Sequence, residues 1–369
     1  MGNDSARIKR RAGCEGLDRV FSLRSLYKNP LYLLFMLLIF SAGCLPGGGQ
    51  NSGAVIRRIA EPYALELLTW ELQNSLAPAA QGSDASVLPV SPELLSRDIE
   101  QALAEQKIAA APPVRTRLQP PPLLLVVSPR ERILYSDRLL LQPGLEISRI
   151  EEVESAIDAI GLSSLVVKIG GFGAAYPAIV SPSMPLKNIV EAAVEEWAHQ
   201  YLALRPLGFL YLLDCLGFSQ DAGVITMNET LAGMIAQEIG DMVYRRYGES
   251  PLPQQAGGTA DGFDFSAEMG LTRRHVDELL AAGRVDEAEV YMEQRRIFFN
   301  SHDFPIRKLN QAYFAFHGIY GQDPGSASPV YGQMRKLRDA SSSLAGFVDR
   351  VSAMTVYAEL EQAVDELPR

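Results

Sequence analysis

The strand signals of this chain cluster in one short stretch, and this clustering constrains the fold more than any other feature. Three apolar runs, at 123–127, 133–141 and 165–169, have the length and composition of buried strands. From Pro185 onward, apolar residues recur at helical spacing instead. A few strands followed by many helices predict an α+β fold, in which a small N-terminal sheet packs on a predominantly helical domain.

Proline and glycine mark the ends of the expected helices. The spacing predicts one helix over 185–204, stopped by Pro206, and another over 227–247, closed by Gly248. Loops rich in Ala, Ser, Gly, Pro or Gln are expected at 77–97 and 249–264. The remaining helices are expected over 56–76, 92–106, 147–160, 266–281, 285–300, 305–320, 328–339 and 342–366, the last with a break.

The N-terminus has the charge pattern of an exported, membrane-anchored protein. Residues 1–30 form a leader with seven basic and three acidic residues, and residues 31–46 form an uncharged signal or membrane anchor. A basic flank before an apolar run predicts a cytoplasmic leader and a body on the extracytoplasmic side. The run SAGC, which ends at Cys44, resembles the end of a bacterial lipoprotein signal. The alternative is an uncleaved anchor.

The rest of the chain divides into three expected regions. A helix and Pro-rich linker region covers 47–120, an α+β region covers 121–250, and a helical region covers 251–369. Subtracting the leader's seven basic and three acidic residues from 34 and 44 leaves 27 basic and 41 acidic residues. An acidic body repels phosphates, which argues against a nucleic acid partner. Cys215 is the only cysteine beyond the anchor, so no disulfide framework or paired-cysteine zinc site is expected there.

A group of polar residues lies on the expected helix over 185–204, opposite its apolar stripe. Glu195 and His199 are four residues apart, so their side chains share one face and can hold one ion. Glu196 lies beside them, where it can hold a water near that ion. Glu229, on the next long helix, completes a possible set of three metal ligands.

Two interpretations without a metal remain open at this point. Glu195 and Glu196 also fit the solvated face of an ordinary amphipathic helix. Thr226 and Glu229 have the spacing of a capping box, in which Glu229 would only close the helix N-terminus.

The two motifs together resemble those of the gluzincin metallopeptidases, the thermolysin-like class. The hallmark of that class is HExxH on one helix and NExxA on the next, and this chain has EEWAH ending at His199 and NETLA starting at Asn228. The resemblance covers roughly 121–250 and implies a zincin-like fold. It also implies zinc held by Glu195, His199 and Glu229, with Glu196 as the general base.

The same resemblance implies a peptide or protein substrate and suggests further residues. The glycine-rich strand end at 170–173 resembles the edge strand along which such enzymes lay a peptide. A late Tyr or His stabilises the oxyanion in this class, which makes Tyr313 and His317 candidates, or else a packed aromatic pair. Glu238 and Asp241 are either supports for His199 or ordinary polar residues.

The chain departs from the family pattern at Glu195, which replaces the first histidine of HExxH. Two carboxylates and one imidazole still supply three ligands, but they neutralise the ion and reduce its acidity, and they suit manganese or iron as well as zinc. The sequence therefore predicts a membrane-anchored metal-dependent peptidase whose activity can be impaired by the presence of Glu195 in place of histidine. The alternative is a catalytically inactive metallopeptidase-like surface protein with a binding or assembly role. A di-iron bundle, which Glu196-x-x-His199 also fits, needs a second ExxH helix that the sequence lacks.

Overall fold

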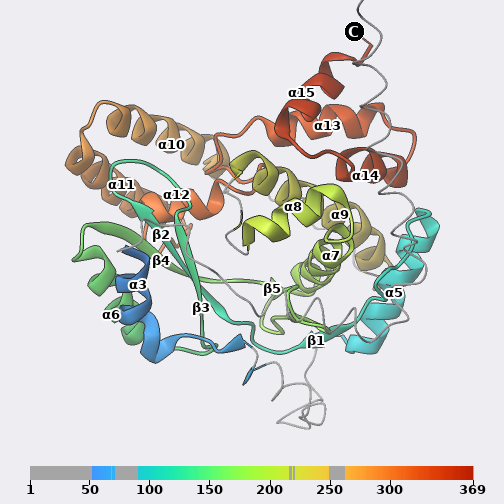
Figure 1. The fold of residues 1–369 in the computed structure, drawn as a ribbon, viewed down its shortest axis with the longest axis horizontal. Coiled ribbons are helices and arrows are strands. Elements are labelled where there is room, and N and C mark those ends of the chain that lie inside the picture. The colour runs from blue at the N-terminus through green and yellow to red at the C-terminus, as the bar shows by residue number, and fades with distance from the viewer. Residues whose placement is uncertain are drawn as a thin grey trace, which may run out of the picture. The chain divides into compact units, whose positions relative to one another are not determined.

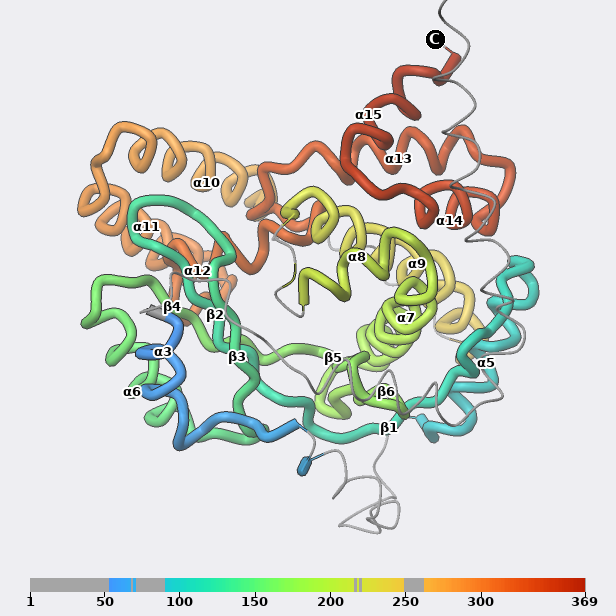
Figure 2. The backbone as a smooth tube through the Cα atoms, viewed as in Figure 1, coloured from blue at the N-terminus to red at the C-terminus, as the bar shows by residue number. Residues whose placement is uncertain are grey.

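The described part of the chain is an α+β fold, as the sequence predicts (Figures 1 and 2). All of it belongs to one compact unit, Gly43–Arg369. The leader and the expected anchor at 31–46 lie outside the described residues. No helix within the described ranges is both long enough and apolar enough to cross a membrane. The computed structural model describes residues 52–67, 69–70, 90–215, 218, 221–248 and 262–368.

The first sheet has three antiparallel strands in the order β3-β2-β4. Its apolar residues alternate between two covered faces, as the period of two in a strand requires. Leu125 and Val127 of β2 pack with α3 and α6, whereas Val126 packs with α12 on the opposite face. The elements are α3 (Ser52–Ala60), β2 (Leu123–Pro129), β3 (Asp137–Leu141), α6 (Ile147–Asp158), β4 (Leu162–Lys168) and α12 (Gln311–His317). The three predicted strands therefore form one sheet.

A second small sheet follows the order β1-β6-β5, with β1 and β6 parallel and β5 antiparallel at one edge. Strands of two or three residues are too short to show an alternation of apolar and polar residues. The sequence therefore indicated only the glycine-rich strand end at 170–173. The strands are β1 (Thr116–Leu118), β5 (Gly171–Phe172) and β6 (Ala178–Val180). Helix α7 packs on β5 and β6.

The main helical core forms around α7 and α9, which lie side by side (Figure 1). Trp197 of α7 is buried there and donates from Nε1 to the Pro112 carbonyl at 2.8 Å. Pro206 follows the end of α7, as predicted, but it also begins α8, a helix that was not predicted. The elements of this core are α5 (Pro92–Glu105), α7 (Leu186–Leu202), α8 (Pro206–Cys215) and α9 (Ala222–Arg246).

The C-terminal helices agree with the sequence prediction, apart from α12. The predicted helix over 305–320 begins only at Gln311, because the Asn310 side chain caps it by accepting from the Tyr313 amide at 2.9 Å. The others are α10 (Phe265–Ala281), α11 (Val285–Asn300), α13 (Val330–Ala340), α14 (Leu344–Ser352) and α15 (Tyr357–Asp365).

The predicted helix over 56–76 is interrupted after Ala60, and helical backbone returns only at 67 and 69–70. Pro62 lies in a short 3₁₀ turn, Glu61–Tyr63, and proline cannot donate the hydrogen bond that would continue an α-helix. The chain then runs beside β3, where the Leu65 amide donates to the Leu140 carbonyl at 2.9 Å. Residues 71–76 of this prediction lie outside the described part.

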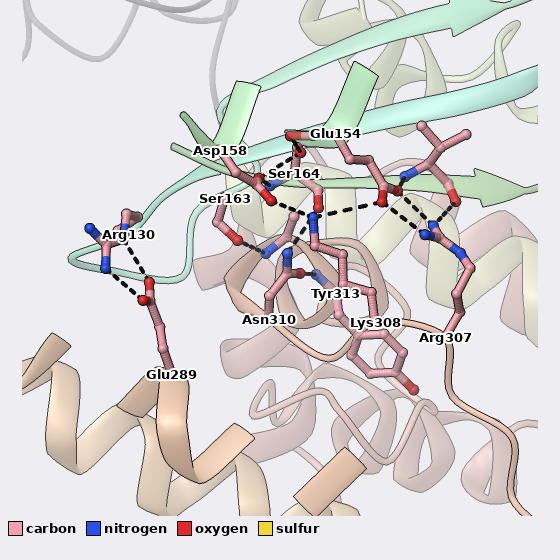
Figure 3. Close-up of polar contacts among 12 residues, drawn as sticks. Arg130, Glu154, Asp158, Ser163, Ser164, Glu289, Arg307, Lys308, Asn310 and Tyr313 are labelled. Atoms are coloured by element: carbon pink, nitrogen blue, oxygen red, sulfur yellow. Dashed lines mark hydrogen bonds and ion pairs between the residues drawn. The ribbon is translucent and has the colours of Figure 1, made fainter. Parts of the chain in front are cut away.

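Ion pairs join the first sheet to the C-terminal helical region (Figure 3). Arg307 donates two hydrogen bonds to the buried carboxylate of Glu154, at 2.6 and 2.8 Å, and Lys308 lies 2.6 Å from Asp158. Glu154 also accepts from the backbone amide of Val166 in β4 at 2.6 Å. These contacts hold the segment before α12 against α6 and β4.

Candidate metal centre

Helices α7 and α9 bring the three predicted ligands together. One ligand atom each from Glu195, His199 and Glu229 lie within 4.8 Å of one another. His199 Nε2 and Glu229 Oε2 lie 3.5 Å apart. Two atoms bound tetrahedrally to one zinc ion are about 3.4 Å apart, because each metal–ligand bond is near 2.1 Å. We call these three residues the metal-ligand group.

The capping interpretation of Glu229 is wrong. Helix α9 begins at Ala222, and its N-cap is Asp221, whose carboxylate accepts from the amides of the first turn. Glu229 therefore lies two turns inside the helix, where its side chain is only 5% exposed. Thr226 donates instead to the Ala222 carbonyl at 2.9 Å. A buried carboxylate needs a partner, and the imidazole of His199 supplies one.

The carboxylates of Glu195 and Glu196 are half-buried and not on a freely solvated face. Glu196 packs against the glycines of β5 and the following turn. A Cβ atom on Gly171 would lie 2.4 Å from Glu196 Oε1, and one on Gly173 would lie 2.7 Å from Oε2. The Gly173 backbone also hydrogen-bonds to the Glu196 carboxylate. The absence of side chains at these two positions is what lets the carboxylate lie there.

Two neighbours orient the other ligands. Tyr211 of α8 donates from its hydroxyl to Glu229 Oε1 at 2.6 Å, and its ring stacks on His199 with 5.7 Å between centroids. The amide of Asn228 lies 3.1 Å from His199 Nδ1. Asn228 Oδ1 is buried with no hydrogen-bond partner. Reversing this amide would let Oδ1 accept from Nδ1–H, which satisfies the orphaned oxygen and leaves Nε2 with a lone pair for a metal.

The group carries several protons when no metal is bound. Burial raises the pKa of Glu195 to about 7 and that of Glu196 to about 8. Burial opposes the imidazolium of His199, but the carboxylates of Glu229, Glu196 and Glu195 outweigh it and raise the pKa of His199 to about 9. Burial would raise the pKa of Glu229, but the charge of His199 and the hydrogen bonds from His199 and Tyr211 outweigh burial and lower this pKa. The cluster can therefore exchange protons near neutral pH.

The structure arranges the predicted oxyanion candidates differently. The rings of Tyr313 and His317 contact each other at a tilt, with 4.1 Å between centroids, and His317 Nδ1 lies 2.7 Å from Asp323. None of the contacts described for either residue reaches the metal-ligand group, which agrees with the alternative of a packed aromatic pair. Tyr320, which follows α12, interacts with the site electrostatically. Burial first, and then the negative charges of Glu229, Glu195 and Glu196, raise its pKa well above the ordinary value.

A backbone contact explains the position of Tyr320. The amide of Gly321 donates to the Thr230 hydroxyl at 3.1 Å, one residue along α9 from Glu229. Sequence reasoning missed Tyr320 and Tyr211. Tyr320 ends the helix predicted over 305–320 but lies in the loop after α12, and Tyr211 lies in a helix with apolar residues on all sides, so neither had a distinguishing signal.

Glu238 and Asp241 do not support His199. Glu238 forms a two-pronged ion pair with Arg338, at 2.7 and 2.8 Å, and Asp241 pairs with Lys187 at 3.3 Å. The role that sequence reasoning offered to them belongs to Asn228.

The donor set fits a divalent ion. Two carboxylate oxygens and one imidazole nitrogen are a ligand set that zinc, manganese and iron all accept. The orphaned Asn228 oxygen and the close approach of the ligand atoms are consistent with such an ion. No protein-family model matches this chain, and no curated protein or solved structure is significantly similar to it. The inference of function therefore depends on the geometry of these residues.

Proposed function

We propose that this protein is a membrane-anchored, metal-dependent peptidase that uses zinc, or manganese or iron in its place. The observation that carries the proposal is the approach of Glu195, His199 and Glu229 to within 4.8 Å, with the carboxylate of Glu196 close enough to interact with all three. Catalytic zinc sites combine three protein ligands with one position for water or substrate. The resemblance to the gluzincins supports the same assignment.

In this proposal each neighbouring residue has a separate role. A divalent ion held by Glu195, His199 and Glu229 would polarise the scissile carbonyl and make the attacking water more acidic. Glu196 takes a proton from the attacking water and passes it to the leaving amine as the C–N bond breaks. Tyr320 donates a hydrogen bond to the oxygen on which negative charge develops. Its raised pKa keeps the phenol protonated and able to donate.

An extended peptide is the substrate that the surrounding fold favours. Among the described residues, strand β5 pairs with β6 on one side only, so its other edge can accept a further strand. Glu196 packs on this same strand, so a peptide added there would lie beside the general base. The expected anchor at 31–46 would place the reaction on the extracytoplasmic side of the membrane.

The test uses the full-length protein purified in detergent. We expect about one bound divalent ion per chain by elemental analysis, and cleavage of a mixed peptide library that stops on chelation and returns with zinc. Glu196→Gln should retain the ion and lose at least about 100-fold in cleavage rate, because it removes proton transfer alone. His199→Ala should lose the ion as well. A protein that binds no metal and cleaves no peptide would contradict the proposal.

The inactive alternative rests on one residue, Glu195, and the same assay separates it. Glu195→His rebuilds the HExxH pattern, and imidazole donates more strongly to zinc than a carboxylate does. If the native protein binds zinc but cleaves nothing, and Glu195→His gains cleavage that depends on Glu196, the native chain is a binding protein on a peptidase fold. If Glu195→His loses an activity that the native protein has with manganese or iron, Glu195 is a ligand selected for that ion.

A further inference from the structure

Strand β5 has two different faces. A Cβ atom at Gly171 would lie 2.4 Å from the Glu196 carboxylate, and one at Gly173 would lie 2.7 Å from it, so both positions face α7. Val180 of β6, which pairs with Gly171, is buried in the core around α7, and this agrees with the assignment. Side chains alternate along a strand, so the Phe172 ring points to the opposite face.

Trp70 packs against Phe172 from a distant part of the sequence. The two rings meet edge to face, with 6.3 Å between centroids and 71° between planes. The segment that leads to Trp70 is held beside β3 by the hydrogen bond from the Leu65 amide to the Leu140 carbonyl, and it then runs toward β5 (Figure 1). Both rings are half-buried, so each offers apolar surface to a further group. We call Trp70 and Phe172 the aromatic pair.

A peptide added to the other edge of β5 would bring one side chain to the aromatic pair. Within the described ranges β6 is the strand that pairs with β5, which leaves this edge for a substrate. The peptide residue opposite Phe172 would direct its side chain to the same face, with the two Cβ atoms about 4.5–5.5 Å apart. The peptide residues before and after it would point to the Glu196 face. The aromatic pair would therefore contact a residue adjacent to those that lie beside the proposed general base.

We propose that the aromatic pair binds a large apolar side chain of the peptide substrate, an aromatic ring above all. This rests on the proposed peptidase function and gives it a substrate class: peptides with an aromatic residue at a fixed distance from the bond that is cleaved. A ring in this place can pack at the centroid spacing of roughly 4.5–7 Å that aromatic pairs adopt. A carboxylate would lose hydration there and meet the negative faces of the rings, so the aromatic pair disfavours acidic side chains.

Binding can be measured separately from cleavage. The protein is full-length Glu196→Gln in detergent with zinc, so that the probes are not cut. The probes are three fluorescein-labelled hexapeptides of alanine, which carry phenylalanine, glutamate or alanine at the third position, and binding is followed by fluorescence anisotropy. We expect the phenylalanine peptide to bind about tenfold more tightly than the alanine peptide, because its ring is buried against two others. The glutamate peptide should bind no more tightly than the alanine peptide.

Substitutions at Trp70 test which residues produce this preference. Trp70→Ala should abolish it, whereas Trp70→Phe, which keeps a ring, should retain a preference of about threefold or more. Phe298→Ala is the matched control and should leave the preference unchanged. It removes a half-buried ring of α11 that meets Phe263 edge to face, with 5.5 Å between centroids.

Photo-crosslinking locates the bound side chain without a change in the protein at Trp70. The probe is the same hexapeptide with benzoylphenylalanine at the third position, and the attachment sites are mapped by mass spectrometry. We expect attachment to β5 or to the segment 65–70. If Trp70→Ala does not fold, judged by thermal unfolding, this mapping and the comparison of the three peptides still decide.

Three results would overturn the role of the aromatic pair: equal binding of the phenylalanine and alanine peptides, a full preference that survives in Trp70→Ala, or attachment only outside β5 and 65–70. Failure of the aromatic pair differs from failure of the peptidase. A phenylalanine preference without cleavage by the native protein supports the aromatic pair and contradicts the peptidase. Cleavage of peptides without any such preference, and at no constant distance from an aromatic residue, does the reverse.

Discussion

Tyr211 contacts the metal-ligand group twice, through its hydroxyl on Glu229 and through its ring on His199. Removing a partner that orients a metal ligand typically lowers metal affinity about 10–100-fold. We therefore expect Tyr211→Phe to weaken zinc binding at least about tenfold, measured by competition with a fluorescent chelator. Tyr357→Phe is the matched control, because its hydroxyl donates to Gln333 at 2.8 Å, within the C-terminal helices. Equal zinc affinities for both variants would show that the Tyr211 hydroxyl does not position Glu229.

The protons held by Glu195, Glu196 and His199 contribute to the pH dependence of the stability of the metal-free protein, in the direction opposite to Glu229, whose pKa is lowered. Their pKa values in the folded protein are about 7, 8 and 9, each above the ordinary value. A raised pKa means that the folded state binds the proton more tightly, so this stabilisation is complete below the ordinary pKa and is lost as the pH rises through the folded value. The window runs from about pH 4.5, set by the glutamates, to about pH 9, set by the histidine.

We therefore expect the Tm of the metal-free protein to fall as the pH rises through this window. The reference is the double variant Glu195→Gln, Glu196→Gln, in which the two glutamate contributions are gone and the fall is shallower. Metal must displace the same protons, so the rise in Tm on adding zinc should grow with pH. Calorimetry on both proteins at several pH values checks the sign. A Tm that rises with pH in the native protein relative to the double variant would contradict the protonation state inferred for the cluster.

At the scale of elements, the edge strand β5 determines where Glu196, the proposed general base, lies. Ala at position 171 would put a Cβ 2.4 Å from Glu196 Oε1, a contact that real side chains do not tolerate. The atom that must move is the end of a flexible side chain, so the strand can stay in place while Glu196 is displaced. Gly171→Ala should then lower cleavage at least about tenfold, since a small misplacement of a catalytic group is costly, and keep both metal content and Tm.

The control for this change is a glycine with open space around it. A Cβ on Gly332, in α13, would meet nothing within 4 Å, and alanine favours a helix there. Gly332→Ala should keep full activity and raise stability slightly. If Gly171→Ala cleaves peptide as fast as the native protein, the absence of a side chain at position 171 does not position the Glu196 carboxylate.

At the scale of the whole molecule, the ion pair between Arg307 and Glu154 connects the sheet to the segment that carries α12 and Tyr320. Glu154 is only 3% exposed, so removing Arg307 leaves a buried carboxylate with Lys308, 3.7 Å away, as its remaining cation. Breaking a buried pair in this way costs roughly 3 kcal/mol. Arg307→Ala should therefore lower the free energy of unfolding by about that amount.

The measurement is urea unfolding followed by circular dichroism, with Arg284→Ala as the surface comparison. Arg284 pairs with Glu287 where both side chains are more than half exposed, and such pairs contribute little. Similar urea midpoints for Arg307→Ala and Arg284→Ala would mean that Lys308 alone compensates the charge of the Glu154 carboxylate. A loss of stability found only in Arg307→Ala would support the Arg307–Glu154 ion pair as the contact that holds the two regions together.

Local patterns in the sequence predicted the elements whose periodicity is long and strong. The first sheet, α7 and most C-terminal helices follow from apolar spacing and from Pro and Gly at their ends, because burial of one face is a local property of the chain. Spacing also placed Glu195, Glu196 and His199 on one face of α7. Short or interrupted elements escaped prediction: β1 and β6 have too few residues for a period, and α8 is apolar all round.

Only the tertiary structure decided what surrounds the three ligands. The start of α9 at Ala222 turned Glu229 from a possible cap into a buried candidate ligand, because helix length depends on packing in the core as well as on local capping signals. Tyr211, Tyr320 and Asn228 reached the ligands through contacts between elements far apart in sequence. Distance along the chain carries no information about such contacts, since they form only after the helices and the sheet pack together.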